Sequence, residues 1–231
     1  MRKHIWRVTV AALVLALLLP VAAEAQGKKK KKKKKKKSGA VAQKTVEVEV
    51  MPLFVRGDFS AVVEAVDEAS GPEVVVSPDA VFVAGLSQEA MSSAGKASRT
   101  YAGLDELGRS DPWHHLGVSA AALVAGDLDQ ALKDAERGVE LANGDKVAHK
   151  YAHFQQGRVL LARQDFAASG DAFVRTLQID GDFAYAHYWA GFSYNKTGNL
   201  VSMTNHFERF LELAPEAPER QQVVAILAAM Y

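Results

Sequence analysis

The chain has 231 residues and no cysteine, which excludes disulfides, cysteine-ligated zinc and a thiolate nucleophile. Its net charge of +1 hides a division, because the part from Ser38 to Tyr231 has 15 Lys and Arg against 26 Asp and Glu, a net of −11. About 190 residues therefore form an acidic body, long enough for one sizeable core or a short repeat array.

The first 25 residues have the three parts of a secretory signal peptide. A positively charged start precedes an apolar run from Val8 to Val21, and Ala23-Glu24-Ala25 supplies the small-x-small cleavage pattern. We expect cleavage after Ala25 and an exported protein, periplasmic or secreted. If the signal is not cleaved, the protein is membrane-anchored, although the apolar run is short for about 30 Å of hydrocarbon.

Residues 26–44 form a linker dominated by ten consecutive lysines. Like charges repel one another and bury nothing, which predicts an extended, disordered run. A polycation can bind an anionic envelope polymer or a lipid surface by counterion release, without specific nucleic-acid recognition. The run could instead fold onto the acidic body, or have no binding role. The candidate polyanion-binding residues are Lys28, Lys29, Lys30, Lys31, Lys32, Lys33, Lys34, Lys35, Lys36 and Lys37.

Residues 45–111 carry a degenerate form of the helical pattern that follows. Asp79 to Leu107 fits one pair of helices, with a turn around Ser92 to Gly95. Gly57-Asp58-Phe59 looks like the turn of a still earlier pair. The first helix of that earlier pair is doubtful, because Thr45 to Val50 alternates as a strand would and a proline follows.

Helix-start signals recur at a nearly constant spacing. Ser77 and Asp111 each stand just before a proline, and Asp145 and Asp182 offer further caps. Successive caps are 34, 34 and 37 residues apart, a period typical of helical hairpins. A small residue also recurs in the middle of the first helix of each clear hairpin, where it lets two helices approach closely. These residues are Ser119, Gly157 and Gly191.

At these positions the chain resembles the tetratricopeptide repeat (TPR) family. The third unit is the best match, through Gly191, Tyr194, Gly198, Leu200, Phe207 and Pro215. The resemblance covers residues 112–216. It implies an all-α fold, a right-handed α-solenoid of helix-turn-helix repeats, three clear and one or two degenerate, with residues 217–231 as a C-terminal capping helix. Histidines stand where the family often has tryptophan: His115, His153 and His187.

The resemblance also implies a binding surface, because in this family the first helix of each hairpin lines a concave groove. The residues that would face the groove form a largely aromatic and aliphatic set. Two alternatives remain open: the groove binds a partner, or the chain's own Val46 to Val55 fills it. The candidate peptide-binding residues are Trp113, Leu116, Tyr151, Phe154, Arg158, Tyr185, Tyr188, Phe192, Asn195 and Lys196.

No enzyme signature is complete. Ser93 and Lys96 have the spacing of some acyl enzymes, but no partner motif follows. His149 and His153 lie one helical turn apart without the glutamate of a metalloprotease motif. We therefore expect no catalysis, no cofactor and no metal.

The expected function is an exported scaffold or adaptor that binds protein or peptide segments in an aromatic-lined groove. The alternative is an envelope polyanion- or surface-binding protein that acts through its poly-lysine tail, with repeats that only oligomerise. A pull-down with and without the tail distinguishes the two.

Overall fold

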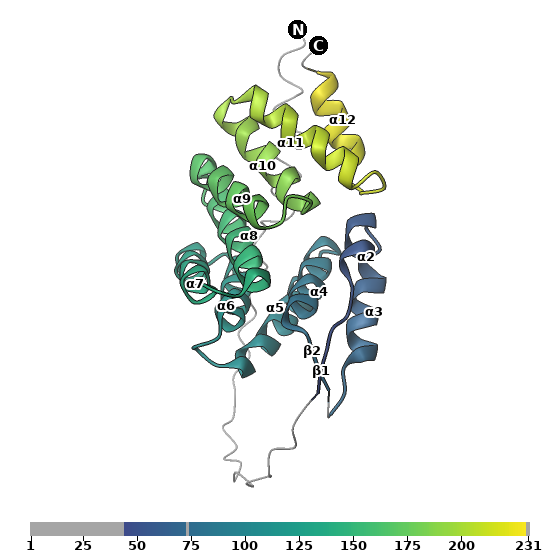
Figure 1. Ribbon diagram of the computed structural model, residues 1–231, viewed down its shortest axis with the longest axis vertical. Coiled ribbons are helices and arrows are strands. Elements are labelled where there is room, and N and C mark those ends of the chain that lie inside the picture. The colour runs from purple at the N-terminus through teal and green to yellow at the C-terminus, as the bar shows by residue number, and fades with distance from the viewer. Residues whose placement is uncertain (1–43, 73, 230–231) are drawn as a thin grey trace.

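The computed structural model describes residues 44–72 and 74–229, so the predicted signal peptide and the lysine run lie outside the described residues. In this part of the chain the helices follow one another as antiparallel pairs that stack into an open superhelix (Figure 1). None of the described helices is both long and apolar enough to cross a bilayer. The all-α solenoid expected from the sequence is confirmed.

Four helical hairpins form the stack. The three clear units are α6 with α7, α8 with α9 and α10 with α11, and the second helix of one unit packs on the first helix of the next. The bounds of the helices in these hairpins and of the last helix are α4 Pro78–Ala90, α5 Ala94–Ala102, α6 Pro112–Ala125, α7 Leu128–Leu141, α8 Lys146–Ala162, α9 Phe166–Ile179, α10 Ala184–Thr197, α11 Leu200–Leu213 and α12 Arg220–Ala228. A short 3-10 helix, η1 Gly103–Leu107, links α5 to α6.

Two of the four predicted caps form. The Asp111 carboxylate accepts a hydrogen bond from the Trp113 amide at 2.9 Å, and the Asp145 carboxylate accepts one from the Val147 amide at 2.9 Å. Ser77 precedes α4 but its side chain makes no capping hydrogen bond. The prediction for Asp182 was wrong, because α10 begins at Ala184 and Phe183 takes the capping position without a side-chain bond.

The glycines in the middle of the first helices allow the close approach of two helices that the repeat pattern predicts. A methyl group added to Gly157 would lie 2.7 Å from the Phe173 ring, and one added to Gly191 would lie 2.5 Å from the Phe207 ring. Both rings are fully buried and belong to the second helix of the same hairpin. The absence of a side chain therefore lets an aromatic ring sit directly on the first helix.

Replacing Gly191 by alanine should destabilise the fold by about 1–3 kcal/mol, because the buried Phe207 ring has no free space into which it can move. Urea denaturation of the full chain measures this. Gly95→Ala is the matched control, since nothing lies within 4 Å of its added methyl group. Its stability should match the wild type to within about 1 kcal/mol. Equal losses in the two variants would contradict the close approach of α10 and α11.

The N-terminal elements of the described chain depart from the repeat. The predicted strand near Thr45 to Val50 is shorter than expected, and β1 Lys44–Val46 pairs in parallel with β2 Val74–Val76. Two helices lie between these strands, α2 Met51–Arg56 and α3 Phe59–Ala69. The doubtful first helix thus exists, and Pro52 stands in its first turn, where a missing amide hydrogen costs nothing.

The pair of α2 and α3 stands at the N-terminal end of the stack, where α3 packs on α4, and α2 faces the C-terminal end of the stack across the concave side. Gly57 ends α2 with a left-handed φ of 84°, and a methyl group added there would lie 2.5 Å from the Pro218 side chain. Figure 1 shows α2 facing the loop that precedes α12. The early and late parts of the described chain therefore meet, and they cover part of the concave side.

Candidate functional site

Most of the predicted groove residues lie in the core. The expectation that they are exposed was wrong for seven of them: Trp113, Leu116, Tyr151, Phe154, Tyr185, Tyr188 and Phe192 are 0–6 % exposed. Tyr151 shows the reason, since its ring lies 5.7 Å from Phe82 of α4 and 5.5 Å from Trp113 of α6. The first helices pack against one another as well as against their own partners, so no wide aromatic groove remains.

The three polar members of the predicted set have separate environments. Arg158 is largely buried in an ion pair with Glu89 of α4. Asn195 is half-buried and Lys196 is exposed at the end of α10, where the Lys196 ammonium lies 6.0 Å from the Phe166 ring centre. Of the three, only Arg158 joins the site described next.

The chain's own N-terminal segment fills part of the concave side, as one of the two alternatives proposed. Val50 and Phe54 are buried, and the Phe54 ring centre lies 4.9 Å from that of Tyr185 on α10. The strand expected from the sequence ends at Val50, and Phe54 points inward from the short helix α2 that follows it. The helix covers the groove incompletely and leaves a cavity beside it.

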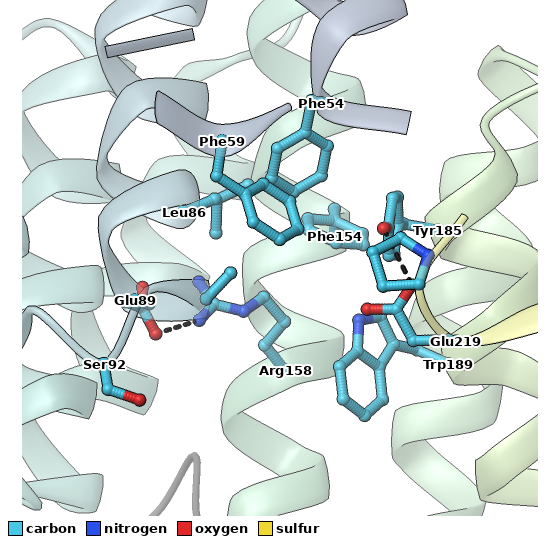
Figure 2. Close-up of a pocket in the computed structure, with 12 residues that line it drawn as sticks. Phe54, Phe59, Leu86, Glu89, Ser92, Phe154, Arg158, Tyr185, Trp189 and Glu219 are labelled. Carbon is cyan, nitrogen blue, oxygen red and sulfur yellow. Dashed lines mark hydrogen bonds and ion pairs between the residues drawn. The ribbon is translucent and has the colours of Figure 1, made fainter. Parts of the chain in front are cut away.

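This space, which we call the central cavity, has a volume of about 290 Å³. Its walls come from the α2–α3 hairpin, the last turn of α4, the middle of α8 and α10, and the loop before α12. In Figure 2, Phe54 and Phe59 lie on one side of the cavity and Trp189 lies on the other. The lining residues are Phe54, Phe59, Leu86, Glu89, Ala90, Ser92, Phe154, Arg158, Tyr185, Trp189, Pro218 and Glu219.

A buried ion pair forms one wall. An Arg158 Nη atom donates to the Glu89 carboxylate at 2.6 Å, and a second Nη atom donates to the Gln155 side chain at 2.8 Å. The Tyr101 hydroxyl donates to the other Glu89 oxygen. Burial and the nearby Glu89 charge raise the pKa of Tyr101, so its hydroxyl keeps its proton. Burial alone would lower the pKa of Arg158, but Glu89 and Tyr101 together more than offset this and raise it, so the guanidinium stays charged.

A second carboxylate lies on the opposite side of the cavity. The Tyr185 hydroxyl donates to Glu219 at 3.0 Å (Figure 2). Burial raises the pKa of the Glu219 carboxyl, while the hydrogen bonds from its own backbone amide and from Tyr185 partly lower it again. Burial and the same carboxylate raise the pKa of Tyr185. The cavity therefore has aromatic walls with one compensated ion pair and one carboxylate held by a neutral donor.

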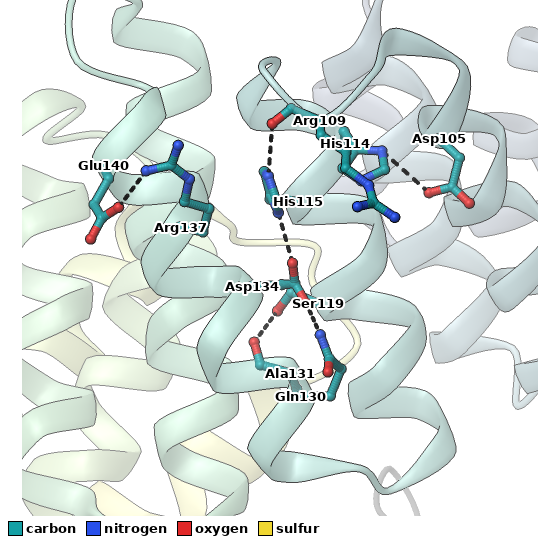
Figure 3. Close-up of polar contacts among 10 residues, drawn as sticks. All are labelled: Asp105, Arg109, His114, His115, Ser119, Gln130, Ala131, Asp134, Arg137 and Glu140. Atoms are coloured by element: carbon teal, nitrogen blue, oxygen red, sulfur yellow. Dashed lines mark hydrogen bonds and ion pairs between the residues drawn. The ribbon is translucent and has the colours of Figure 1, made fainter.

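Two of the three equivalent histidines make polar contacts between the helices of their hairpin. The Nδ1 atom of His115 lies 2.7 Å from the Asp134 carboxylate, and its Nε2 atom lies 3.1 Å from the Arg109 carbonyl oxygen (Figure 3). His187 faces His206 in the same way, with 3.0 Å between their Nδ1 atoms. Burial lowers the pKa of His187, and burial together with His187 lowers the pKa of His206 to about 4.

The repeat pattern explains why His153 has no such partner. Asp134 and His206 each stand 19 residues after their histidine. The residue at the same distance from His153 is Ala172, and the buried Nδ1 atom of His153 makes no hydrogen bond. Across the described chain, no three or more His, Cys, Asp or Glu side chains are grouped to hold a metal ion.

Several cavity residues were absent from the sequence prediction, namely Phe59, Glu89, Trp189 and Glu219. Phe59 belongs to the turn predicted at Gly57-Asp58-Phe59, and Glu219 lies at the start of the predicted capping helix. Glu89 and Trp189 carry no such signal, because they line the cavity only through the packing of helices that are distant in sequence.

Two solved structures are similar to this chain in fold. TTC0263, a thermophilic TPR protein of Thermus thermophilus, aligns with a TM-score of 0.57 at 17% identity, over 77% of this chain and 94% of that one. The APC/C hetero-tetramer Cut9–Hcn1 aligns with a TM-score of 0.54 at 14% identity, over 75% of this chain and 33% of that one. No protein-family model and no curated protein matches the sequence. The structural matches show that the fold is a solenoid of the TPR type.

Proposed function

We propose that this chain is a non-enzymatic scaffold that binds a segment of another protein and holds one apolar side chain of that segment in the central cavity. The observation that carries the proposal is the cavity itself, where aromatic side chains from α2, α3, α8 and α10 surround about 290 Å³. Interfaces place their anchor side chains in such desolvated aromatic pockets. The structural match to Cut9–Hcn1, a complex of two proteins, supports a protein partner.

The proposal keeps the export expected from the sequence. The chain would act in the periplasm or as a secreted protein, and Lys28–Lys37 would tether it to an anionic polymer or lipid surface. A second function rests on the charge division of the sequence. Ten lysines beside a body of net charge −11 favour a protein whose affinity for envelope polyanions lies in the tail alone.

Filling the cavity tests the first function. Ala90 is exposed at the end of α4 and lines the cavity, so Ala90→Trp adds bulk there without removing a core contact. Partner capture from an envelope extract should fall by a factor of about 30, which corresponds to about 2 kcal/mol for a lost anchor. Val201→Trp, which adds the same bulk at a position that is 74% exposed, should capture partners as the wild type does.

The full chain with Lys28–Lys37 replaced by serine completes the experiment. If a partner still binds after this replacement but no longer binds to Ala90→Trp, the cavity is its binding site. Partners that are lost with the lysines and kept in Ala90→Trp contradict it and support the tail.

A further inference from the structure

The central cavity contains one carboxylate without a positive partner. Among the described residues, Glu89 is paired with Arg158, but no lysine, arginine or histidine lies within ion-pair distance of Glu219. Glu219 is half-buried, and a neutral phenol is the side chain that donates to it. A buried carboxylate is costly when no cation compensates it, so a positive ligand group would lower its free energy.

The charges around the cavity sum to a negative value. Glu89 and Arg158 cancel at a separation of 2.6 Å, which leaves the charge of Glu219. The last turn of α4 also borders the cavity, through Leu86, Glu89 and Ala90. The C-terminal end of a helix carries a partial negative charge. The N-terminal ends of α3 and α12, at Phe59 and Glu219, border the cavity with the opposite partial charge, so the carboxylate of Glu219 itself is what favours a cation over a carboxylate or phosphate ligand.

The walls suit the rest of a cationic ligand. The Phe54 ring centre lies 5.5 Å from that of Phe59 and 4.9 Å from that of Tyr185, and Trp189 faces this group across the cavity (Figure 2). Aromatic rings attract cations at their faces, tryptophan most strongly. They also pack against methylene groups. A ligand that combines an ammonium group with an alkyl stem would satisfy both the carboxylate and the rings, and a lysine side chain has this chemistry.

We propose that the side chain held in the central cavity is a lysine of the partner protein, with its stem against Phe59 and Trp189 and its ammonium group at Glu219. This inference rests on the proposed function and specifies the chemistry of its anchor. It predicts that the cavity discriminates by charge among ligands of the same length.

Small probes test the charge preference on the full chain. The probes are n-pentylammonium, which reproduces a lysine side chain, the neutral n-pentanol, and pentanoate. Binding is followed by NMR through the indole N–H signal of Trp189, assigned with Trp189→Phe. The wild type should bind n-pentylammonium about ten times more tightly than n-pentanol, and pentanoate most weakly. Glu219→Gln should abolish the preference, because n-pentylammonium loses the carboxylate that pairs with its charge. Glu216→Gln, which removes an exposed carboxylate three residues away, should keep the preference.

The outcomes separate this inference from the proposed function. Equal binding of n-pentylammonium and n-pentanol by the wild type, or equal effects of the two glutamate variants, would overturn the lysine assignment while the cavity remains an apolar anchor site. No response to any probe would overturn both. A variant with Lys28–Lys37 replaced by serine that binds n-pentylammonium much more tightly than the wild type would also overturn the assignment to a partner, because the chain's own lysines would then be the occupant.

Discussion

The double replacement of Tyr151 and Tyr188 by alanine should unfold the protein at room temperature. Both rings are almost fully buried, Tyr151 against Phe82, Trp113 and Phe183, and Tyr188 against Phe192 and Phe210. Truncation of a core aromatic costs about 3–5 kcal/mol. Two such losses in adjacent repeats sum to about 6–10 kcal/mol, which is comparable to the whole stability of a typical domain, about 5–15 kcal/mol.

Circular dichroism during thermal and urea denaturation measures this effect. The matched control is the replacement of both tyrosines by phenylalanine, which keeps the packing and removes only the hydroxyl groups. The Tyr188 hydroxyl donates a hydrogen bond to Gln222 at 3.3 Å, and the control loses this bond. The control should stay folded. If the alanine double variant is folded and its melting temperature is unchanged, both tyrosines must lie in an open groove, and the packing described above is wrong.

The sequence contained enough to predict the hairpins. Each turn between the two helices of a unit has a local signal, such as Gly126 and Gly198 with φ of 81° and 77°, which favours glycine. Aspartate or asparagine then caps the second helix, as Asp127 does for α7 and Asn199 for α11. These determinants act within a few residues, so one sequence is sufficient to read them.

The face of each first helix could not be predicted in the same way. Helix α10 is apolar or aromatic on every side, and eight of its residues from Ala184 to Ser193 are buried. A helix that is apolar all round has no periodic pattern to say which face meets which neighbour. The family pattern used to assign residues to the groove therefore pointed to core residues. One of them is Tyr188, whose ring contacts Phe210 of α11 and not solvent.

The cavity depends on contacts between distant parts of the chain. Phe54 contacts Tyr185, which is 131 residues later in the sequence, and Arg158 pairs with Glu89, which is 69 residues earlier. Such contacts arise because the curvature of the stack brings α2 and α4 close to α8 and α10 across the concave side. No local pattern encodes this curvature, and the alternation from Thr45 to Val50 pointed to a longer strand than the three residues of β1.

Removal of one partner of the Arg158–Glu89 pair should destabilise the fold strongly. The side chains are 13% and 11% exposed, so Arg158→Met leaves the Glu89 carboxylate buried and unpaired, with the Tyr101 hydroxyl as its remaining donor. Breaking a buried pair in this way costs about 3–5 kcal/mol, chiefly because the remaining charge keeps its desolvation penalty. The free energy of unfolding from urea denaturation measures the loss.

The double variant Glu89→Met with Arg158→Met should recover most of that stability, since replacement of a buried ion pair by apolar side chains of similar volume is often neutral or favourable. The surface pair of Arg209 with Glu212 is the control. The side chains of Arg209, Glu212 and the second partner of Arg209, Asp182, are 42%, 65% and 74% exposed, so Arg209→Met should change the free energy of unfolding far less than Arg158→Met. If Arg158→Met and Arg209→Met lose the same stability, the wall of the cavity is open to water. The charge balance that favours a lysine there would then fail, because solvent would screen Glu219 as well.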